Sequence, residues 1–128
     1  MIRKFVATDQ MAITQLIESE GLDWKDYFEG NNREKYWRSL TDSITYVKVH
    51  GDEIIGYLRA IDDHGYDLYV CDLLVHQDHR GQGYGKEILT HVMNLYPNRD
   101  IYVMSDVDPY YEQLGYDKIG SIYQVKSK

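Results

Sequence analysis

The stretch that decides the fold reads HRGQGYGKEILTHVM, from His79 to Met93. Its glycines, at positions 81, 83 and 85, fall within five residues and directly precede a segment with helical apolar spacing. Glycine is among the poorest helix formers, so its concentration here needs another reason. The first N–H groups of a helix have no internal partner, and the helix dipole is positive there. A strand, a glycine-rich turn and a helix therefore predict an anion site.

Composition and charge narrow the classes of protein and partner. The chain has 128 residues, of which 43% are hydrophobic and 27% charged. That is enough for one domain with a substantial core, and we expect residues 1–128 to form a single domain. Its 21 acidic and 14 basic residues give a net charge of −7. Such a surface disfavours nucleic acid and anionic membranes as partners and favours a cationic small molecule.

Cysteine, histidine and the amino terminus give no sign of a disulfide, a metal site or a targeting segment. The lone Cys71 lies among strand-forming residues, so we interpret it as a buried apolar side chain and not as a catalytic thiol. The five histidines lack the spacing of metal ligands. The opening MIRKFVATDQ has no apolar signal core, and no stretch approaches the ~20 apolar residues that cross a bilayer. We therefore expect a cytoplasmic location.

Periodicity and turn residues predict the order strand, helix, helix, strand, strand, strand, helix, strand, helix, strand. Thr8 or Asp9 is expected to cap the first helix, which buries Ile13, Leu16 and Ile17. The strand at 66–75 is apolar enough to be covered on both faces. The other predicted strands are 2–6, 43–49, 54–61, 100–105 and 121–125, and the later helices span 32–40, follow the glycines, and span 108–115.

Two common phosphate-binding loops do not fit these glycines. A P-loop requires Gly, four residues, then Gly-Lys-Ser/Thr, whereas Arg80 stands at the first position and Glu87 at the last. A dinucleotide-binding loop requires G-x-G-x-x-G, whereas Lys86 stands in place of its third glycine. The predicted anion site therefore belongs to another class.

Two signatures resemble those of the GNAT superfamily of N-acetyltransferases. Arg80-x-x-Gly83-x-Gly85 resembles that family's acetyl-CoA pyrophosphate loop, and DPYYEQLGY, Asp108 to Tyr116, resembles its second signature helix. The order of predicted elements agrees with both. The resemblance implies an α/β (α+β) fold with a mixed, mainly antiparallel central sheet flanked by helices. It also implies transfer of an acetyl group from acetyl-CoA to a primary amine, without a metal, by direct attack in a ternary complex.

The resemblance also implies where acetyl-CoA binds. Backbone amides of the glycine-rich loop would hold the pyrophosphate, with help from the Arg80 side chain. The preceding strand would bond the pantetheine arm like an added strand, because the family's fourth and fifth strands diverge and leave backbone groups free. Without the adjoining loop, LLV at 73–75 would be interpreted as plain core. The implied binding residues are Leu73, Leu74, Val75, Arg80, Gly81, Gln82, Gly83, Tyr84, Gly85 and Lys86.

Two residues are candidates for the chemistry. Tyr111 falls at the family's catalytic tyrosine, which implies that its phenol protonates or stabilises the leaving thiolate. The attacking amine must lose a proton, and Asp72, beside the implied thioester site, is the first candidate for its base. In the alternative interpretation Asp72 hydrogen-bonds a neighbouring loop. Asp62 and Asp63 are interpreted as turn residues or as charges that attract the substrate.

The signatures leave the acceptor open. Many members of the family carry an Asn on the fifth strand, where this chain has Ser105 and Asp106. The first helices supply aromatic residues without a diagnostic pattern. A cationic small-molecule amine is the first hypothesis. A protein or peptide amine, and a non-catalytic acyl-CoA-binding module, are the alternatives. The family also suggests a homodimer, for which the sequence indicates no interface.

Overall fold

The structure, a computed structural model, describes residues 1–126. Its strands are β1 (Ile2–Lys4), β2 (Ile44–His50), β3 (Glu53–Asp62), β4 (Leu68–Val75) and β5 (Ile101–Val103). Its α-helices are α1 (Gln10–Glu18), α2 (Asn32–Asp42), α3 (Tyr84–Leu95) and α4 (Asp108–Gln113). Three 3-10 segments are η1 (Ala7–Asp9), η2 (Gly21–Tyr27) and η3 (Gln77–His79). Across residues 1–126, no helix has the length and apolar character needed to span a bilayer.

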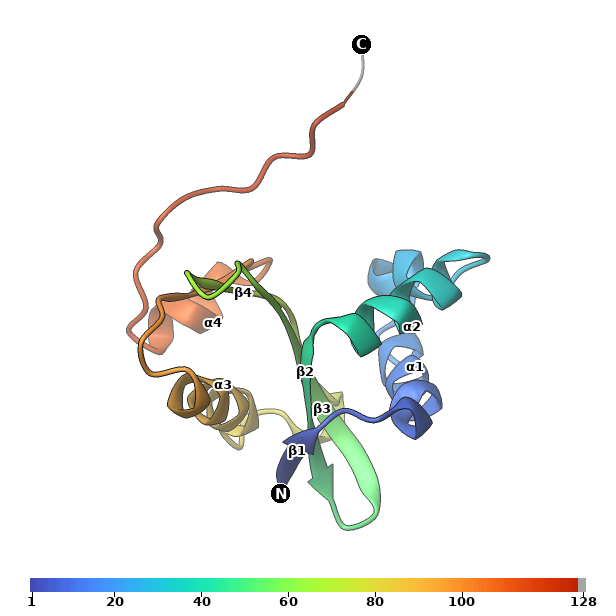
Figure 1. Ribbon diagram of the computed structural model, residues 1–128. Helices are drawn as coiled ribbons and strands as arrows, with labels where there is room; N and C mark the ends of the chain where they lie inside the picture. Colours follow the sequence, from blue (N-terminus) through green and yellow to red (C-terminus); the bar gives the residue numbers. More distant parts are fainter. Residues whose placement is uncertain (127–128) are drawn as a thin grey trace.

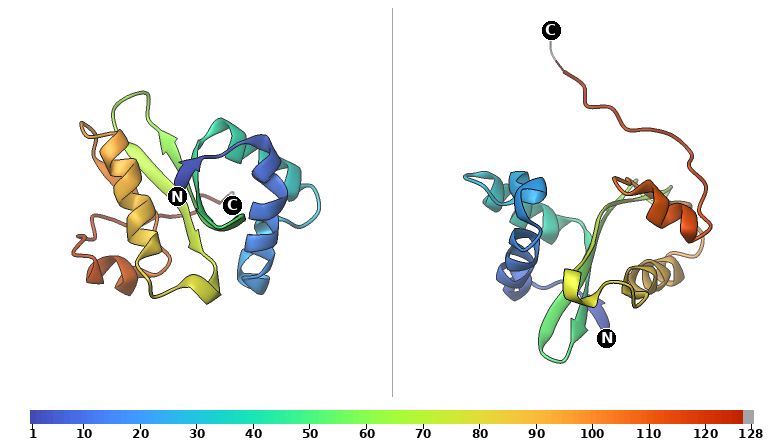
Figure 2. Two further views of the ribbon diagram at one scale, coloured as in Figure 1. Left: turned by 90° about the horizontal axis from the view of Figure 1, so that it is seen from below. Right: turned by 180° about the vertical axis from the view of Figure 1, so that it is seen from behind.

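The strands form one sheet in the order β1-β2-β3-β4-β5. The first three pairs are antiparallel, and β5 runs parallel to β4. Parallel neighbours need a long crossover connection, which α3 supplies. Helices α1 and α2 cover one face of the sheet, and α3 and α4 cover the other (Figure 1, Figure 2). This architecture confirms the predicted α/β (α+β) class with a mixed, mainly antiparallel sheet flanked by helices.

Each face of the sheet has its own apolar core. The apolar stripe of α1 packs against Val47 and Tyr57, as its helical spacing predicted. On the opposite face, α3 packs against β3 and β4. Alternate residues of a strand point to opposite faces, so β3 gives Tyr57 to the first core and Leu58 to the second. The buried residues of the second core are Leu58, Ala60, Leu68, Val70, Ile88, Leu89 and Val92.

A β-bulge at Cys71 changes the face that β4 presents. Arg59 pairs with Asp72 but Ala60 pairs with Val70, so Cys71 is an extra residue on β4. Strict alternation would place Asp72 on the same face as Val70, which packs on the α3 side. The bulge instead turns Asp72 toward α2. We expected Cys71 to be fully buried, but it is only half-buried. This partial burial raises the pKa of its thiol.

The strand predicted at 121–125 is wrong. In the described part of the chain, residues 117–126 form no helix or strand and are exposed. Beyond α4 they run away from the sheet (Figure 1). An alternating apolar pattern forms a strand only where a sheet edge accepts it, because strand preference is a preference for packing on neighbours.

The predicted side-chain cap of α1 is also wrong. Asp9 precedes the helix, but its carboxylate makes no capping hydrogen bond. It accepts two hydrogen bonds from the Arg3 guanidinium, at 2.8 and 2.9 Å, and one from the Val6 amide at 2.9 Å. A bidentate, charge-assisted partner outcompetes a helix amide. Asp9 therefore ties β1 to the start of α1.

Candidate active site

The glycine-rich loop places free amides at the first turn of α3. Gly81 and Gly83 have φ angles of 78° and 82°, a left-handed conformation that glycine adopts without strain. The Gly83 carbonyl accepts a hydrogen bond from the Glu87 amide at 3.0 Å, which closes the first turn. Within residues 1–126, the amides of residues 81–85 donate to no oxygen of the protein. The turn therefore has the open donors that an anion site requires.

An ion pair between a buried lysine and an exposed glutamate sets the charge around this turn. Lys48 of β2 is only 8% exposed, and its Nζ donates to Glu87 of α3 at 2.8 Å. The same Nζ lies 4.9 Å from the centre of the Tyr84 ring. The ammonium neutralises the one acidic side chain in the first turn of α3. The positive potential of the helix terminus is thereby preserved.

Gly85 makes room for Tyr110 of α4. A Cβ at position 85 would overlap the Tyr110 hydroxyl. The backbone of Lys86 lies beside the same hydroxyl. The first turns of α3 and α4 are therefore in direct contact. Tyr110 is thus part of the candidate site, although the sequence analysis did not single it out. The sequence feature that could have identified Tyr110 is its position next to Tyr111 in the second signature.

The expected divergence of the fourth and fifth strands is confirmed. β5 pairs only with Leu68–Val70 of β4, and the last contact is the Met104 amide donating to Val70 at 2.9 Å. In the described residues, no strand pairs with Leu73, Leu74 and Val75 on the side toward β5. An open sheet edge can accept an added extended chain through its backbone groups.

The Arg80 side chain is engaged away from the loop amides. Its Nε donates to the Val75 carbonyl at 2.9 Å, and one terminal nitrogen pairs with Glu20 at 2.5 Å. Glu20 lies between α1 and η2. Arg80 therefore ties the end of β4 to the connection that follows α1. A contact between Arg80 and a phosphate stays a prediction.

Tyr111 is half-buried on α4, on the α3 side of the sheet. Its ring meets that of Tyr110 nearly at right angles, with centroids 5.1 Å apart. Burial first, then the neighbouring Tyr110 and Asp106, raise the pKa of Tyr111 to about 12. The phenol therefore keeps its proton at neutral pH and can act as a hydrogen-bond donor.

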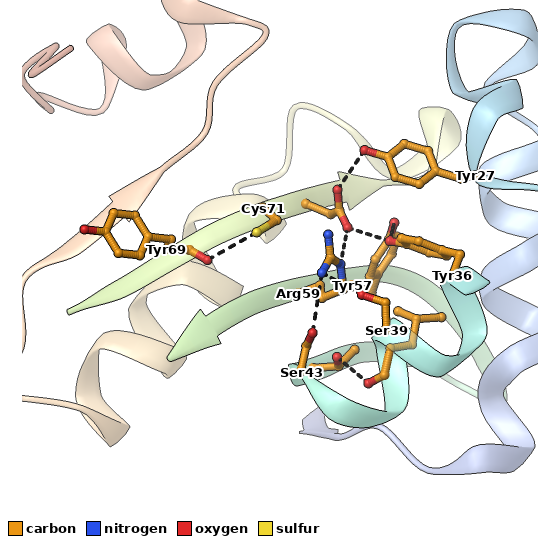
Figure 3. Close-up of polar contacts among 11 residues, drawn as sticks. Tyr27, Tyr36, Ser39, Ser43, Tyr57, Arg59, Tyr69 and Cys71 are labelled. Atoms are coloured by element: carbon orange, nitrogen blue, oxygen red, sulfur yellow. Dashed lines mark hydrogen bonds and ion pairs between the residues drawn. The ribbon is translucent and has the colours of Figure 1, made fainter. Parts of the chain in front are cut away.

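Asp72 is the centre of a buried hydrogen-bond cluster between β4 and α2. Its partners Tyr27, Tyr36 and Arg59 are labelled in Figure 3. Asp72 is 3% exposed. One carboxylate oxygen accepts from the Tyr27 hydroxyl at 3.1 Å. The other accepts from the Tyr36 hydroxyl at 2.5 Å and from Arg59 Nε at 2.6 Å. The carboxylate is therefore saturated by protein donors, and its contact with η2 through Tyr27 matches the neighbouring-loop interpretation.

The Asp72 cluster continues into both packed layers. The Tyr36 and Tyr57 hydroxyls lie 2.7 Å apart, and Arg59 donates to Ser39 of α2 at 2.8 Å. A buried charge pair is tolerated only when its remaining hydrogen bonds are satisfied, and here they are. The cluster therefore fixes η2 and α2 against the sheet beside the open edge of β4.

Sequence reasoning missed the partners of Asp72. Arg59 and Asp72 are each the only charged residue within a mostly apolar run, IIGYLRAI and LYVCDLLV. Opposite charges isolated in two neighbouring strands indicate a cross-strand ion pair, and that signal was present. Tyr27 and Tyr36 gave no such signal, because they lie 45 and 36 residues from Asp72 in the chain.

A hollow of about 200 Å³ lies between η2 and α2. Among its lining side chains are Asp26, Lys35 and the Tyr27 and Tyr36 that hold Asp72. Asp106, exposed after β5, lies close enough that its charge contributes to raised pKa values of both Tyr27 and Tyr111, after the larger effect of burial. The hollow borders the Asp72 cluster, because Tyr27 and Tyr36 belong to both.

Other residues singled out from the sequence have plainer surroundings. Asp62 pairs with Arg99 at 2.5 Å and accepts from the Gly65 amide at 2.9 Å, which are the contacts of a turn residue. Ser105 accepts from the Val107 amide at 3.1 Å. No group of three His, Cys, Asp or Glu residues suited to a metal occurs between residues 1 and 126.

Comparison with known proteins gives a family match and partial relatives. The model of the "Acetyltransferase (GNAT) family" matches residues 11–116. "Histone acetyltransferase TAP1" of Glycine max is 32% identical over 81 residues, which are 55% of this chain and 35% of that protein. The chain spans about half the length, or less, of the first curated relatives it matches.

Solved structures with the same fold cover nearly the whole chain. A GNAT family protein, SP0256 from Streptococcus pneumoniae, has a TM-score of 0.76 at 19% identity over 99% of this chain and 98% of that one. The aminoglycoside acetyltransferase meta-AAC0020 from a soil metagenomic sample, in complex with sisomicin, has a TM-score of 0.72 at 19% identity over 99% and 96%. These likenesses establish the fold.

Proposed function

This chain belongs to the acetyltransferase (GNAT) family, and from that premise we propose that it transfers an acetyl group from acetyl-CoA to a primary amine on a cationic small molecule. One observation carries the proposal. The free amides of residues 81–85 follow the open edge of β4, and α4, which holds Tyr111, contacts the same turn through Tyr110. Donors for an anion, an edge for an extended chain and a protonated phenol thus lie together.

The residues around the turn fit acetyl-CoA as co-substrate. Amides of Gly81 to Gly85 would bond the pyrophosphate, where a side chain at the two left-handed glycines would be strained. The backbone of Leu73 to Val75 would bond the amides of the pantetheine arm. The arm would then lead from the turn along β4 toward Asp72 and the hollow.

The proposed reaction is direct attack of the amine on the thioester carbonyl carbon. The protonated amine first gives up one proton to a base. A C–N bond then forms and the C–S bond breaks, and the second proton that the nitrogen loses balances the one that the departing sulfur gains. We assign Tyr111 to the sulfur. Its pKa of about 12 lies above the ~8.5 of a thiol, so it contributes chiefly a hydrogen bond to the developing thiolate as the C–S bond breaks.

Asp72 is assigned an indirect role. Both of its oxygens are bonded by protein donors, so it is a positioning residue for Tyr27 and α2 in this proposal. The exposed Asp106 is the carboxylate that we assign to the incoming amine, either directly or through water.

Charge supports a cationic acceptor. The chain carries a net charge of −7, Asp26 lines the hollow together with Lys35, and the charge of Asp106 reaches Tyr27 in its wall. A field of this sign raises the local concentration of cations and lowers that of carboxylates. A protein or peptide amine is the second candidate, favoured by the 32% identity to a histone acetyltransferase over 81 residues.

Release of free thiol from acetyl-CoA, measured with a panel of polyamines, aminoglycosides, acidic amino acids and peptides, tests the proposal. We expect the cationic small amines to give the highest turnover. A peptide as best acceptor would favour the second candidate. Acetyl-CoA binding without thiol release for any amine would identify a non-catalytic acyl-CoA-binding module.

The dependence on salt tests the attraction of cations. The Debye length falls from ~10 Å at 0.1 M to ~3 Å at 1 M salt, so turnover at low amine concentration should fall as salt rises. Asp26→Asn should flatten this dependence. Asp62→Asn is the matched control, because Asp62 is paired with Arg99, and it should leave the dependence unchanged. If the wild type, Asp26→Asn and Asp62→Asn all showed the same salt dependence, the charge of Asp26 would not attract the amine to the hollow.

A further inference from the structure

A row of three side chains stands uncovered on the sheet face that α1 and α2 cover elsewhere. Ile61 of β3 pairs with Tyr69 of β4, and Tyr69 pairs with Tyr102 of β5, so all three project from the same face. Their neighbours Ala60 and Val70 pack in the core on the α3 side, which places the row on the opposite face. Ile61 is 46% exposed, and both tyrosines are partly exposed. This row is named the tyrosine ledge below.

The two tyrosine rings of the ledge form a stacked pair. Their centroids are 5.5 Å apart and their planes differ by 22°. The ring of Tyr69 points away from the Asp72 cluster (Figure 3). β5 is the last strand of the sheet, so in the described part of the chain no further strand lies beside Tyr102. The electron-rich face of an aromatic ring attracts a cation.

Two aspartates lie at one end of the ledge. Asp67 begins the sequence DLY at the start of β4, and Asp100 begins DIY at the start of β5. The Leu68 amide donates to the Asp100 carbonyl at 3.0 Å, so the parallel register continues and sets the two aspartates opposite each other. Residues two apart on a strand share a face, so each carboxylate lies on the side of its tyrosine. The charge of Asp100 first, then burial and the charge of Asp67, raise the pKa of the Tyr102 hydroxyl.

This pair of carboxylates lacks a counter-charge in the described chain. Within residues 1–126, neither Asp67 nor Asp100 forms an ion pair with a basic side chain. The adjacent Arg99 pairs with Asp62 instead, and its guanidinium lies 5.2 Å from the centre of the Tyr96 ring. Like charges opposite each other on neighbouring strands are unfavourable, so a bound cation would relieve this repulsion.

The ledge suits an ammonium group better than an uncharged apolar partner. An apolar partner would cover the rings of Tyr69 and Tyr102 but leave the two carboxylates repelling each other. An ammonium group can lie against an aromatic face and neutralise both carboxylates at once. Charge therefore identifies the occupant as a cation.

We propose that the tyrosine ledge binds the distal ammonium group of an acceptor that carries two cationic groups, such as a linear diamine. This proposal rests on the proposed function and names the acceptor more closely. Tyr69 and Asp72 are three residues apart on β4, which corresponds to about 10 Å along a strand. The distal ammonium would lie at the ledge while the reacting amine lies beside the Asp72 cluster, so the acceptor needs a spacer of comparable length.

Octamethylenediamine and octylamine test this assignment, because only the diamine has a second amine. In the thiol-release assay, the wild-type KM should be about tenfold lower for the diamine. Asp67→Asn with Asp100→Asn should remove this preference and leave kcat nearly unchanged. Asp52→Asn with Glu53→Gln is the matched control, because it removes two exposed charges at the other end of β3, and it should keep the preference. Equal KM values in the wild type, or a preference that survives the ledge variant, would overturn the proposal.

Binding measured without acetyl-CoA separates the ledge from the proposed function. Octamethylenediamine, titrated into protein with isotope-labelled tyrosine, should shift the NMR ring signals of Tyr69 and Tyr102, which are assigned from the two Tyr→Phe variants. The Asp67→Asn, Asp100→Asn protein should show no such shifts.

The combined outcomes are distinct. Ring shifts without thiol release for any amine would support the ledge as an ammonium site and refute the proposed reaction. Thiol release without ring shifts would retain the reaction and overturn the ledge. A lysine-rich peptide that shifts the same signals at lower concentration than the diamine would assign the ledge to a protein partner, and the diamine proposal would be wrong.

Discussion

The Tyr110 hydroxyl of α4 occupies the space where a side chain at Gly85 of α3 would begin. Unlike Gly81 and Gly83, Gly85 has no left-handed backbone, so its need for glycine comes from this contact and not from its φ angle. The helix that opens the candidate anion site and the helix that holds Tyr111 are therefore fitted to each other at one point.

The contact predicts coupled effects of substitution at the two positions. Gly85→Ala alone should destabilise the protein by about 1–3 kcal/mol through overpacking. Tyr110→Phe alone should cost about 0.5–1.5 kcal/mol, because it removes the hydroxyl that packs on Gly85. The double variant should cost less than the sum, because the nearest ring carbon lies 3.3 Å from the added Cβ. Urea unfolding of the four proteins measures the coupling, and strict additivity would contradict the contact.

Gly83→Val should weaken acetyl-CoA binding by about a hundredfold. Its φ of 82° disfavours a β-branched residue, and relaxation of the turn would misplace at least two amides, on the order of 3 kcal/mol. Gly65→Val is the matched control, since Gly65 has a φ of 92° and equally open surroundings in the β3–β4 turn. Calorimetric titration should find normal affinity in the control. Equal affinities in both variants would remove the anion-site assignment.

Tyr111→Phe should separate binding from chemistry. Deletion of the hydroxyl should lower kcat by roughly ten- to a thousandfold and leave acetyl-CoA affinity nearly unchanged. Tyr66→Phe, in an exposed turn, is the control. Because the pKa of Tyr111 is raised to about 12, the phenol stays protonated below it, and wild-type kcat should show no loss from phenol ionisation up to about pH 10. A Tyr111-dependent fall near pH 8 would contradict this.

Tyr27→Phe tests whether Asp72 positions residues or takes the proton. The variant removes one hydrogen bond to Asp72, for about 0.5–1.5 kcal/mol of stability, and should raise KM for the amine. It should leave kcat nearly unchanged. If Asp72 took the proton from the amine, loss of that donor would change kcat as well as kcat/KM. Asp72→Asn is less informative, because an unpaired buried Arg59 costs about 3–5 kcal/mol.

Asp9→Asn should reduce stability in a pH-dependent way. Arg3 first, and the Val6 amide next after the opposing effect of burial, lower the pKa of Asp9 below its ordinary 3.8. Because the pKa of Asp9 is lower in the folded than in the unfolded protein, its carboxylate stabilises the fold at any pH above the unfolded-state pKa. This contribution is lost as the pH falls through the folded-state pKa. The variant should lose about 1.5–3 kcal/mol at pH 7 and progressively less below pH ~4. Asp52→Asn, in an exposed turn, should show neither effect in the same unfolding series.

The sequence by itself determined the features that depend on residues close together in the chain. Helical spacing predicted the buried stripes of α1 and α3, and turn residues predicted the β2–β3 hairpin. The glycines between β4 and α3 predicted the free amides, because backbone conformation and helix-end donors are local properties. The two signatures indicated the family for the same reason.

Only the tertiary structure decided how distant segments meet. The face of β4 that carries Asp72 depends on its pairing with β3, where one extra residue at Cys71 reverses the alternation. The partners of Asp72 come from η2, α2 and β3, and the neighbour of Gly85 comes from α4. Residues 121–125 failed to form the predicted strand because no neighbouring strand pairs with them in residues 1–126. Strand register and side-chain contact are set by partners far apart in sequence, so local patterns alone do not specify them.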